Sequence, residues 1–340
     1  MRYRLLTLAV ATLILISSCR DSKHYYDNFA GFAQGTTYSI IFENNGRLKA
    51  TDLKSEAEKI LHNFDMSLSL YVDSSILSKI NRNEEAVPDT FFTEAFRKSA
   101  EITGMTDGAF DITVGPLVRA WGFGPDERRN ISETKRDSLL NLVGMDKVKI
   151  ISGKVVKTDP RINLDFNAIA QGYSVDVLSK FFDGLGIKSY LIEIGGEVRV
   201  KGDKGGVLWR IGIDKPADNN MLPGNDLQAV ISLKDRSLAT SGNYRKFYIE
   251  NGIKYSHTID PRTGYPANNR LLSATIIADE CAVADGIATA CMVMGKDKTI
   301  EFLGFHPEFD AFLVYSDDKG DYRTWMSENL KQFISEPENQ

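Results

Sequence analysis

The stretch FYIENGIKYSHTIDPRTGYP, residues Phe247 to Pro266, predicts an antiparallel hairpin that ends in a series of tight turns. Apolar and polar residues alternate around Asn251-Gly252, a dipeptide strongly preferred in two-residue hairpin turns. His257 follows the second strand, and Asp260-Pro261 and the Thr263-Gly264 pair favour further turns. An imidazole at this position could act as a base near pH 7, or it could simply hydrogen-bond to the backbone of the turns.

Helical and strand patterns follow each other irregularly along the rest of the chain. Apolar residues at helical spacing predict helices over residues 52–64, 91–103, 132–143, 168–182 and 280–294. Gly104 is predicted to end the second of these helices, and Ser132 to cap the third. Segments rich in β-formers predict strands over residues 34–42, 189–201, 207–214, 227–234 and 271–278, and a hairpin over residues 147–157 that turns at Ser152-Gly153. Because no βαβ repeat relates these elements, the sequence predicts the α+β class in one domain of mixed helices and antiparallel sheets. The absence of a G-x-G-x-x-G or Walker motif excludes a Rossmann or P-loop nucleotide site.

Residues 1–18 have the pattern of a bacterial lipoprotein signal peptide. Arg2 and Arg4 precede the apolar run LLTLAVATLILI, which is shorter than the roughly 20 residues that span a bilayer. The ending ISSC resembles a lipobox, so we expect Cys19 to carry a lipid that holds the protein on the periplasmic side of a membrane. An uncleaved anchor is the alternative. Residues 19–30 are then predicted to be a tether, and residues 31–336 the folded domain.

Charge and cysteine usage exclude two further possibilities. The formal net charge is −5, and loss of the two signal-peptide arginines would make it −7. The sequence therefore predicts no binding to nucleic acid, which requires a basic face. Cys281 and Cys291 lie in one predicted helix, about 15 Å apart, which is beyond the reach of a disulfide.

The segment AVADGIATACMVMG, Ala282 to Gly295, places Asp285 and Thr289 four residues apart on one face of a predicted helix. A carboxylate and a hydroxyl that converge in this way are oxygen ligands suited to Mg²⁺ or Ca²⁺. In the alternative, Thr289 bonds to a carbonyl one turn earlier and Asp285 is only solvated at the helix surface.

Two other segments carry groups suited to a nucleotide. In NLDFNAIAQGYSVD, residues 163–176, Asp165 and Asn167 precede a helix start that could bind an anion, although Asn167 could equally be an N-cap. In TDGAFDITVGPLVRAWGFG, residues 106–124, Asp107 and Asp111 bracket Phe110. Either Phe110 or Tyr71 could stack on a planar heterocycle, or could belong to the core.

Taken together, six blocks of the sequence occur in the order seen in one family. They are QGTTYSI (34–40), FDMSLSLY with SILSKIN (64–81), TDGAFDITVGPLVRAWGFG (106–124), DFNAIAQGYSVD (165–176), SLATSGNYRKFY to HTIDPRTGYP (237–266), and AVADGIATACMVMG (282–295). On these blocks the chain resembles the ApbE-type FAD:protein FMN transferases over nearly all of its mature length.

The resemblance implies a single ApbE-type, T-fold-like catalytic domain that uses FAD as substrate with Mg²⁺. Such an enzyme joins FMN through a phosphoester bond to a Thr or Ser hydroxyl of an acceptor protein and releases AMP. The acceptors implied are flavoprotein subunits of membrane electron-transport complexes, such as the sodium-pumping quinone reductase Nqr and its Rnf relatives. Because these acceptors face the outside of the inner membrane, they suit a protein with the signal peptide found here.

The resemblance also implies roles for individual residues. By motif position, Asp285 and Thr289 would bind the metal together with the backbone carbonyl of Ala168, and His257 would be the base for the acceptor hydroxyl. The residues implied to line the flavin nucleotide are Gln34, Tyr71, Ala109, Phe110, Asp111, Asp165, Gln171 and the backbone of Thr258 and Ile259.

The chain departs from the family pattern at three places. Gln34 stands where the family has Met, and Asn167-Ala168 stands where it has Gly-Gly. Gln171 stands where it has Lys, which removes a positive charge that would help to hold a diphosphate.

Two other functions use similar residues. An FAD pyrophosphatase would release free FMN and AMP from the same site, with water in place of the acceptor hydroxyl. A flavin-binding lipoprotein without activity is the third possibility, and the presence of His257, Asp285 and Thr289 speaks against it.

Overall fold

The computed structural model describes residues 24–44, 46, 48–123, 131–216, 224–243, 247–250, 253–256 and 258–337. The predictions for Cys19 and His257 therefore lie outside the described residues. Within the described part of the chain, no helix combines the length and the apolar character needed to cross a membrane.

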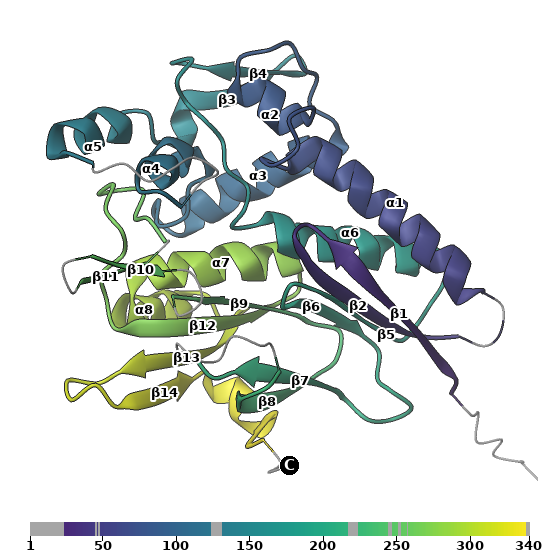
Figure 1. Cartoon of the computed structure of the whole chain (residues 1–340). Helices are drawn as coiled ribbons and strands as arrows, with labels where there is room; N and C mark the ends of the chain where they lie inside the picture. Colours follow the sequence, from purple (N-terminus) through teal and green to yellow (C-terminus); the bar gives the residue numbers. More distant parts are fainter. Residues whose placement is uncertain are drawn as a thin grey trace, which may run out of the picture.

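One large antiparallel sheet runs through the molecule (Figure 1). Its strands lie in the order β1-β2-β5-β6-β9-β12-β13-β14, and each hydrogen-bonded pair in it is antiparallel. The order pairs β9 with β12 and β6, so segments distant in sequence meet at the centre of the sheet. The strands are β1 (Tyr26–Ala33), β2 (Thr36–Glu43), β5 (Tyr190–Ile194), β6 (Glu197–Lys201), β9 (Ser237–Gly242), β12 (Leu271–Ala278), β13 (Asp310–Ser316) and β14 (Tyr322–Met326).

A small sheet in the order β15-β8-β7 packs on one face of the large sheet. Trp209, Ile211 and Ile213 alternate with exposed residues along β7, so a single face of that strand is buried against Val198 and Leu238. Two separate hairpins complete the strands. The bounds are β7 (Trp209–Asp214), β8 (Leu227–Leu233) and β15 (Ile334–Ser335), with hairpins β3 (Val148–Ile151)–β4 (Lys154–Lys157) and β10 (Phe247–Glu250)–β11 (Ile253–Ser256).

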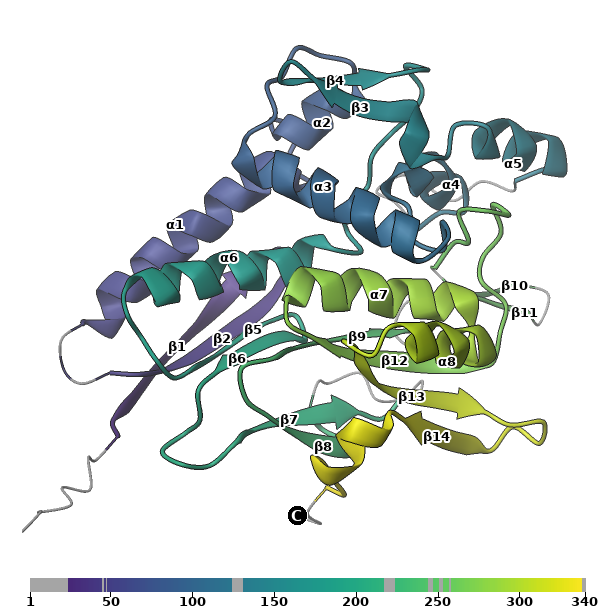
Figure 2. The ribbon, with the colours of Figure 1, turned by 180° about the vertical axis from the view of Figure 1, so that it is seen from behind.

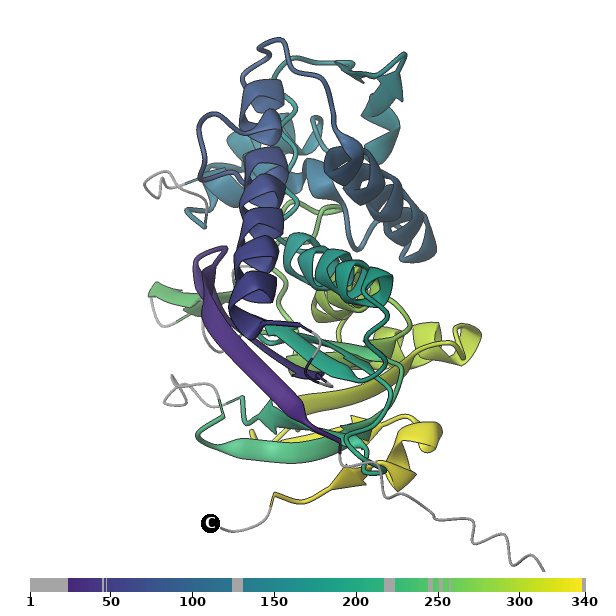
Figure 3. The same cartoon turned by 90° about the vertical axis from the view of Figure 1, so that its right-hand side faces the viewer.

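Helices α6 (Ala170–Gly184) and α7 (Cys281–Met294) cover the other face of the large sheet (Figure 2). Helix α7 is apolar nearly all round, as expected for a helix buried between a sheet and other helices. Helix α1 packs on strands β1 and β2 and against α6, whereas α3 lies farther from the sheet and packs on α7 (Figure 3). The remaining helices are α1 (Ala50–Leu68), α2 (Ile76–Asn81), α3 (Thr90–Met105), α4 (Gly115–Ala120), α5 (Glu133–Leu140) and α8 (Lys296–Phe305), with 3₁₀ turns η1 (Ile112–Val114), η2 (Met145–Lys147) and η3 (Glu328–Gln332).

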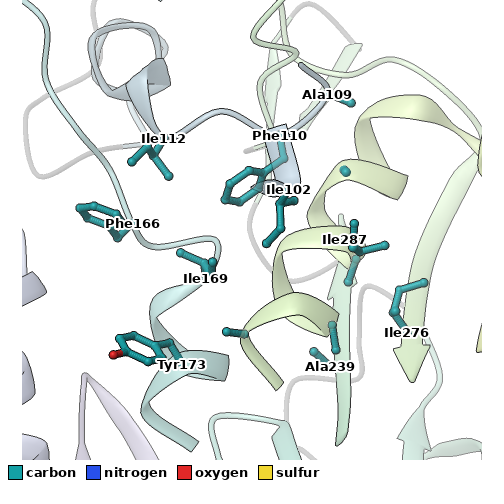
Figure 4. Packing of buried hydrophobic residues seen from close by; sticks show 14 of the residues in the cluster. Ile102, Ala109, Phe110, Ile112, Phe166, Ile169, Tyr173, Ala239, Ile276 and Ile287 are labelled. Carbon is teal, nitrogen blue, oxygen red and sulfur yellow. The ribbon is translucent and has the colours of Figure 1, made fainter. Parts of the chain in front are cut away.

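The largest core cluster joins α3, α7 and the loop after α3 (Figure 4). Ile102 and Phe110 approach α7 beside Gly286, where an added Cβ would lie 2.7 Å from Ile102 Cδ1. Ile287 of α7 packs in the same cluster as Ile276 of β12. Helix α3 is therefore held to the sheet through α7, which also carries Asp285.

Most predicted elements are present, and the α+β class in a single domain is confirmed. The hairpin over residues 147–157 turns at Ser152-Gly153 as predicted, since both residues have positive φ. Ser132 caps α5 by accepting a hydrogen bond from the N–H of Lys135.

Three predictions about local structure are wrong. Gln34 is not in a strand but in the β1–β2 turn, with φ of 52°. Residues 26–30 belong to β1 rather than to a tether, because that strand pairs with β2 over its whole length. Helix α3 continues through Gly104 to Met105, so Gly104 does not end it.

Candidate active site

The site is built around a close crossing of α6 and α7. At Gly172, near the start of α6, an added Cβ would lie 2.4 Å from the carbonyl oxygen of Cys281 and 2.8 Å from Cβ of Asp285. Real Cβ atoms do not approach other atoms so closely, so only glycine allows the two helices to touch here. The contact places the side chain of Asp285 directly beside the first turn of α6.

Asp285 is buried, with 7% of its surface exposed, and its Oδ2 accepts a hydrogen bond of 3.0 Å from the N–H of Gly172. Burial raises the pKa of Asp285 to about 7, the Gly172 N–H opposes this rise, and the negative charge of Asp176 adds to it. The alternative in which Asp285 is only solvated at a helix surface is therefore wrong. The carboxylate is held against α6, and a bound cation would favour its ionised form.

The hydrogen bond to Asp285 also changes the pairing at the start of α6. In a regular helix the N–H of Gly172 would donate to the carbonyl of Ala168, four residues earlier. Here it donates to Asp285 instead, and no described residue donates to the Ala168 carbonyl. Likewise, no described residue accepts the N–H of Gln171. One carbonyl and one N–H thus remain available to a ligand at this helix end.

These groups fit a hard cation. Asp285 Oδ1 has no donor among the described residues, and the carbonyl of Ala168 supplies a second free oxygen. Thr289 lies one turn after Asp285 on α7, with its hydroxyl 3.2 Å from that of Ser241. Oxygen donors of this kind suit Mg²⁺, which usually keeps one or two carboxylates and completes its shell with phosphate and water. No group of three His, Cys, Asp or Glu side chains suited to a metal occurs among the described residues, so Asp285 would be the principal charged ligand.

Asp176 positions α7 next to the site, and it was not among the residues predicted from the sequence. Its two carboxylate oxygens accept the N–H groups of Cys281, at 2.8 Å, and Ala282, at 2.9 Å, so it caps the start of α7 from α6. Burial raises the pKa of Asp176, and these two N–H groups oppose the rise. Asp176 and Gly172 lie one turn apart, so α6 fixes α7 at both Cys281 and Asp285. The only signal in the sequence was the position of Asp176 at the end of the block DFNAIAQGYSVD.

Asp165, Asn167 and Tyr71 lie together at the entrance to α6. Oδ1 of Asp165 accepts the N–H of Asn167 at 2.9 Å, which makes a local turn. Asn167 does not cap α6, because the N-cap is Ile169 and carries no side-chain hydrogen bond. Tyr71 is 68% exposed, and partial burial of its hydroxyl and the charge of Asp165 raise its pKa.

Two of the departures from the family pattern lie in one polar cluster. The hydroxyl of Ser174 lies 2.7 Å from the carbonyl oxygen of Gln171 and 3.2 Å from Oε1 of Gln34. Nε2 of Gln34 is buried and has no hydrogen-bond partner among the described residues. The side chain of Gln171 lies against the β5–β6 turn, where a Cβ on Gly195 would meet its Nε2 at 2.5 Å. The cluster thus carries an amide donor that a ligand could use.

The segment Ala109–Asp111 lies beside α7 but turns its side chains away from solvent. Phe110 is 3% exposed and packs in the core, so of the two aromatic candidates only Tyr71 could stack on a ligand. The Asp111 carboxylate accepts hydrogen bonds from Thr113 and from the N–H of Met145, and burial raises its pKa. Any contact of this segment with a nucleotide would therefore come mainly from its backbone.

Thr258 and Ile259 begin a compact turn segment, Thr258–Pro266, which we call the rim segment. Ile259 pairs with Pro266, and the N–H of Ala267 donates to the carbonyl of Thr258. Helices α4 and α5 hold the segment from outside. Trp121 Nε1–H donates to the carbonyl of Gly264 at 2.8 Å, and the guanidinium of Arg136 lies 4.2 Å above the ring of Tyr265. His257 directly precedes this segment, and its predicted role as base stays a prediction.

Comparisons with known proteins identify related chains over nearly the whole length of this one. The model of the ApbE family matches residues 34–313. The chain is 34% identical to the FAD:protein FMN transferase of Vibrio cholerae, over 96% of this chain and 98% of that protein. It is also 34% identical to that of Haemophilus influenzae, over 92% and 93% of the two chains.

Solved structures give the same result for the fold. The flavin transferase ApbE from Vibrio cholerae superimposes with a TM-score of 0.81 at 33% identity, covering 91% of this chain and 99% of that chain. The apo form of the flavinyl transferase ApbE from Pseudomonas stutzeri superimposes with a TM-score of 0.81 at 31% identity, covering 91% and 97%.

Proposed function

The chain belongs to the ApbE family, and we propose that it transfers FMN from FAD to a Thr or Ser hydroxyl of another protein, with Mg²⁺, and releases AMP. Family membership makes the chain an enzyme of the transferase class. The observation that carries the proposal is the diverted hydrogen bond from Gly172 to Asp285. It leaves the Ala168 carbonyl and Asp285 Oδ1 free at a helix start suited to phosphate.

In this proposal the chain's own residues divide the work. Asp285, Thr289 and the Ala168 carbonyl hold the metal, which would offset the charge of the diphosphate and stabilise the leaving phosphate of AMP. The free N–H of Gln171 and the amide of Gln34 are available to donate to the nucleotide. Tyr71 stacks on a ring, and the backbone of Ala109, Phe110 and Asp111, of Thr258 and Ile259, and the Asp165 turn complete the pocket.

The transfer itself is a displacement at phosphorus. The acceptor hydroxyl oxygen bonds to the phosphorus of the FMN half, and the bond from that phosphorus to the oxygen shared with AMP breaks. His257 takes the hydroxyl proton, and AMP leaves with the bridging oxygen. Because Gln171 replaces a lysine of the family pattern, the site has one positive charge fewer for the diphosphate, and we expect a greater reliance on Mg²⁺.

We further propose that the protein is a lipoprotein anchored through Cys19 on the periplasmic side of a bacterial membrane. The support is the sequence pattern of residues 1–19. In that compartment the acceptors would be flavoprotein subunits of membrane electron-transport complexes of the Nqr or Rnf kind.

The proposal is tested by one incubation with FAD, Mg²⁺ and a candidate acceptor domain, followed by denaturing electrophoresis and mass measurement. Transfer predicts a fluorescent acceptor band whose mass increases by one FMN less water, and AMP in equal amount. The band should disappear when the acceptor Thr or Ser is changed to Ala. Free FMN and AMP without a band would instead support FAD hydrolysis, and unchanged FAD would support a binding protein without activity.

A further inference from the structure

Two exposed apolar side chains mark the edge of the molecule where the described chain begins. Tyr25 is 63% exposed just before β1, and Val207 is 62% exposed in the loop between β6 and β7. In Figures 1 and 2 this loop and the start of β1 lie at the same lower corner of the molecule. We call Tyr25, Lys204 and Val207 the anchor edge.

Hydrogen bonds fasten the β6–β7 loop to the start of β1. The hydroxyl of Tyr26 accepts the N–H of Gly205 at 3.1 Å and donates to the carbonyl of Asp203 at 3.0 Å. The ring of Tyr26 packs edge-on against Trp209, with centroids 5.9 Å apart. The loop that carries Lys204 and Val207 is therefore held beside the point where residues 19–23 must join the domain.

The charges of this edge suit an anionic surface. Lys204 and Lys188 are exposed, and neither pairs with a carboxylate of a described residue. The nearby acid Asp203 pairs with Lys234 at 2.8 Å, and Glu43 accepts a hydrogen bond from His24 at 2.7 Å. The local acids are thus already partnered. Lys204 Nζ lies 5.9 Å from the centre of the Tyr26 ring and 5.7 Å from that of Trp209, but neither Lys204 nor Lys188 has a carboxylate partner among the described residues.

The length of the segment between Cys19 and His24 limits how far the anchor edge can lie from the membrane. Four residues lie between Cys19 and His24, so five residue-to-residue steps of at most about 3.6 Å each span about 18 Å in an extended chain. A lipid on Cys19 would therefore keep the anchor edge within about 18 Å of the bilayer. Tyrosine is favoured at the headgroup level, and lysine is attracted to anionic lipids.

We propose that the anchor edge rests on the headgroups of an anionic phospholipid bilayer and thereby orients the enzyme, an inference that rests on the lipid anchor proposed above. Strand β1 leads from this edge to the turn at Gln34 in the candidate active site. Its 8 residues span about 26 Å at 3.3 Å each. The strand thus limits the height of the site above the membrane to about that distance, which selects acceptors whose hydroxyl lies at a similar height.

The test uses the full lipidated protein on vesicles that contain phosphatidylglycerol. A Val207→Cys variant is labelled with a fluorophore, and quenching by nitroxide-bearing lipids is measured. The two native cysteines of the described chain, Cys281 and Cys291, are buried and protected from the label. Val156→Cys is the matched control, because Val156 is 47% exposed in the β3–β4 hairpin at the opposite end of the molecule (Figure 1).

We expect strong quenching at position 207 and little at position 156. Equal quenching at both positions, or stronger quenching at 156, on protein that floats with the vesicles would overturn the orientation and leave the lipid anchor standing. If the full-length protein does not float with the vesicles, and Cys19→Ala behaves identically, both the anchor and the orientation are wrong.

A charge variant gives a second measurement. Lys204→Gln should weaken docking of the edge about fivefold on anionic vesicles, because one lysine near such a surface contributes about that factor. Lys319→Gln, an exposed lysine in the β13–β14 turn, should change nothing. Both variants should transfer FMN to a soluble acceptor domain at the wild-type rate. No loss of quenching in Lys204→Gln would contradict the contribution of this lysine.

Discussion

The proposed function assigns the α6–α7 crossing and the rim segment to one site, but the two regions are held in place by different means. At the crossing, Gly172, Asp176 and Asp285 are linked through buried backbone-to-carboxylate hydrogen bonds. The rim segment is fastened from outside, by the indole of Trp121 and the stacking of Arg136 on Tyr265. The groups proposed to bind a metal and a diphosphate are therefore part of the core, whereas the groups next to the predicted base depend on surface contacts.

This difference predicts which function each region loses when it is changed. A substitution at the crossing should impair metal binding and can impair folding, because the same bonds serve both. A substitution in or beside the rim segment should impair transfer to the acceptor and leave FAD binding nearly intact.

Asp285→Asn should reduce turnover by about 10⁴-fold, because a bound metal contributes several kcal/mol of charge stabilisation. The amide oxygen can still accept the N–H of Gly172, so the fold should persist. Turnover measured at increasing Mg²⁺ concentrations checks the loss of activity, and a thermal melt of the same variant checks that the fold persists. A near-wild-type rate at low Mg²⁺ would show that Asp285 is not the ligand.

His257→Ala should slow transfer by about 10²–10⁴-fold, which is the usual contribution of a positioned base. FAD affinity should barely change, because the crossing is untouched. Flavin fluorescence titration and the acceptor assay separate the two effects. An equal loss of FAD binding would make His257 a binding residue and remove the distinction between the regions.

Gly172→Ala should force α6 and α7 apart, because its Cβ would lie 2.4 Å from the Cys281 carbonyl. We expect a loss of about 1–3 kcal/mol in unfolding free energy, together with weaker Mg²⁺ binding. Gly184→Ala is the matched control, since nothing lies within 4 Å of its Cβ on the same helix. Chemical denaturation and Mg²⁺ titration should distinguish the two variants. Equal unfolding free energies and equal Mg²⁺ affinities would mean that α6 and α7 can move apart without loss of stability or of metal binding.

The pKa of Asp285 predicts the pH dependence of the metal site. Because the metal-free carboxyl has a pKa of about 7, Mg²⁺ must displace a proton below that pH. Its apparent affinity should fall by about tenfold for each pH unit below 7. The stabilisation that protonated Asp285 gives the metal-free fold is present at low pH and lost as pH rises through about 7. Melts in EDTA at pH 6 and pH 8 should therefore differ more for the wild type than for Asp285→Asn.

Trp121→Phe should have the smallest effect, because it removes one hydrogen bond to Gly264 worth about 1 kcal/mol. Transfer should slow by no more than about fivefold, with FAD binding unchanged. Trp209→Phe removes a similar bond, to the carbonyl of Lys201, but far from the site, and should leave transfer unchanged. Equal rates for both variants would show that the rim segment does not depend on Trp121.

The sequence predicted those features that depend on local patterns. Glycine and serine at positive φ marked the β3–β4 turn, and helical spacing put Asp285 and Thr289 on one helix. It could not predict β9, because the small residues of SLATSG lack apolar alternation. The residues that arrange the crossing also escaped prediction. Asp176 and Cys281 are 105 residues apart, and no local pattern shows which N–H groups a carboxylate will accept across that separation.

Local sequence patterns also could not predict that Asp285 is buried. Its spacing from Thr289 identified a shared face but not what covers that face. The answer depends on Gly172, whose missing side chain allows α6 to approach. A glycine within a helical pattern reads as a weak helix former until its partner helix is known.

The most direct test of the division between the two regions is FAD binding as a function of Mg²⁺ in three proteins. Quenching of flavin fluorescence would be followed for the wild type, Asp285→Asn and His257→Ala at pH 8. We predict that Mg²⁺ tightens FAD binding equally in the wild type and in His257→Ala, and has no effect in Asp285→Asn. Mg²⁺ dependence that persists in Asp285→Asn, or is lost in His257→Ala, would contradict the assignment of the metal to the crossing.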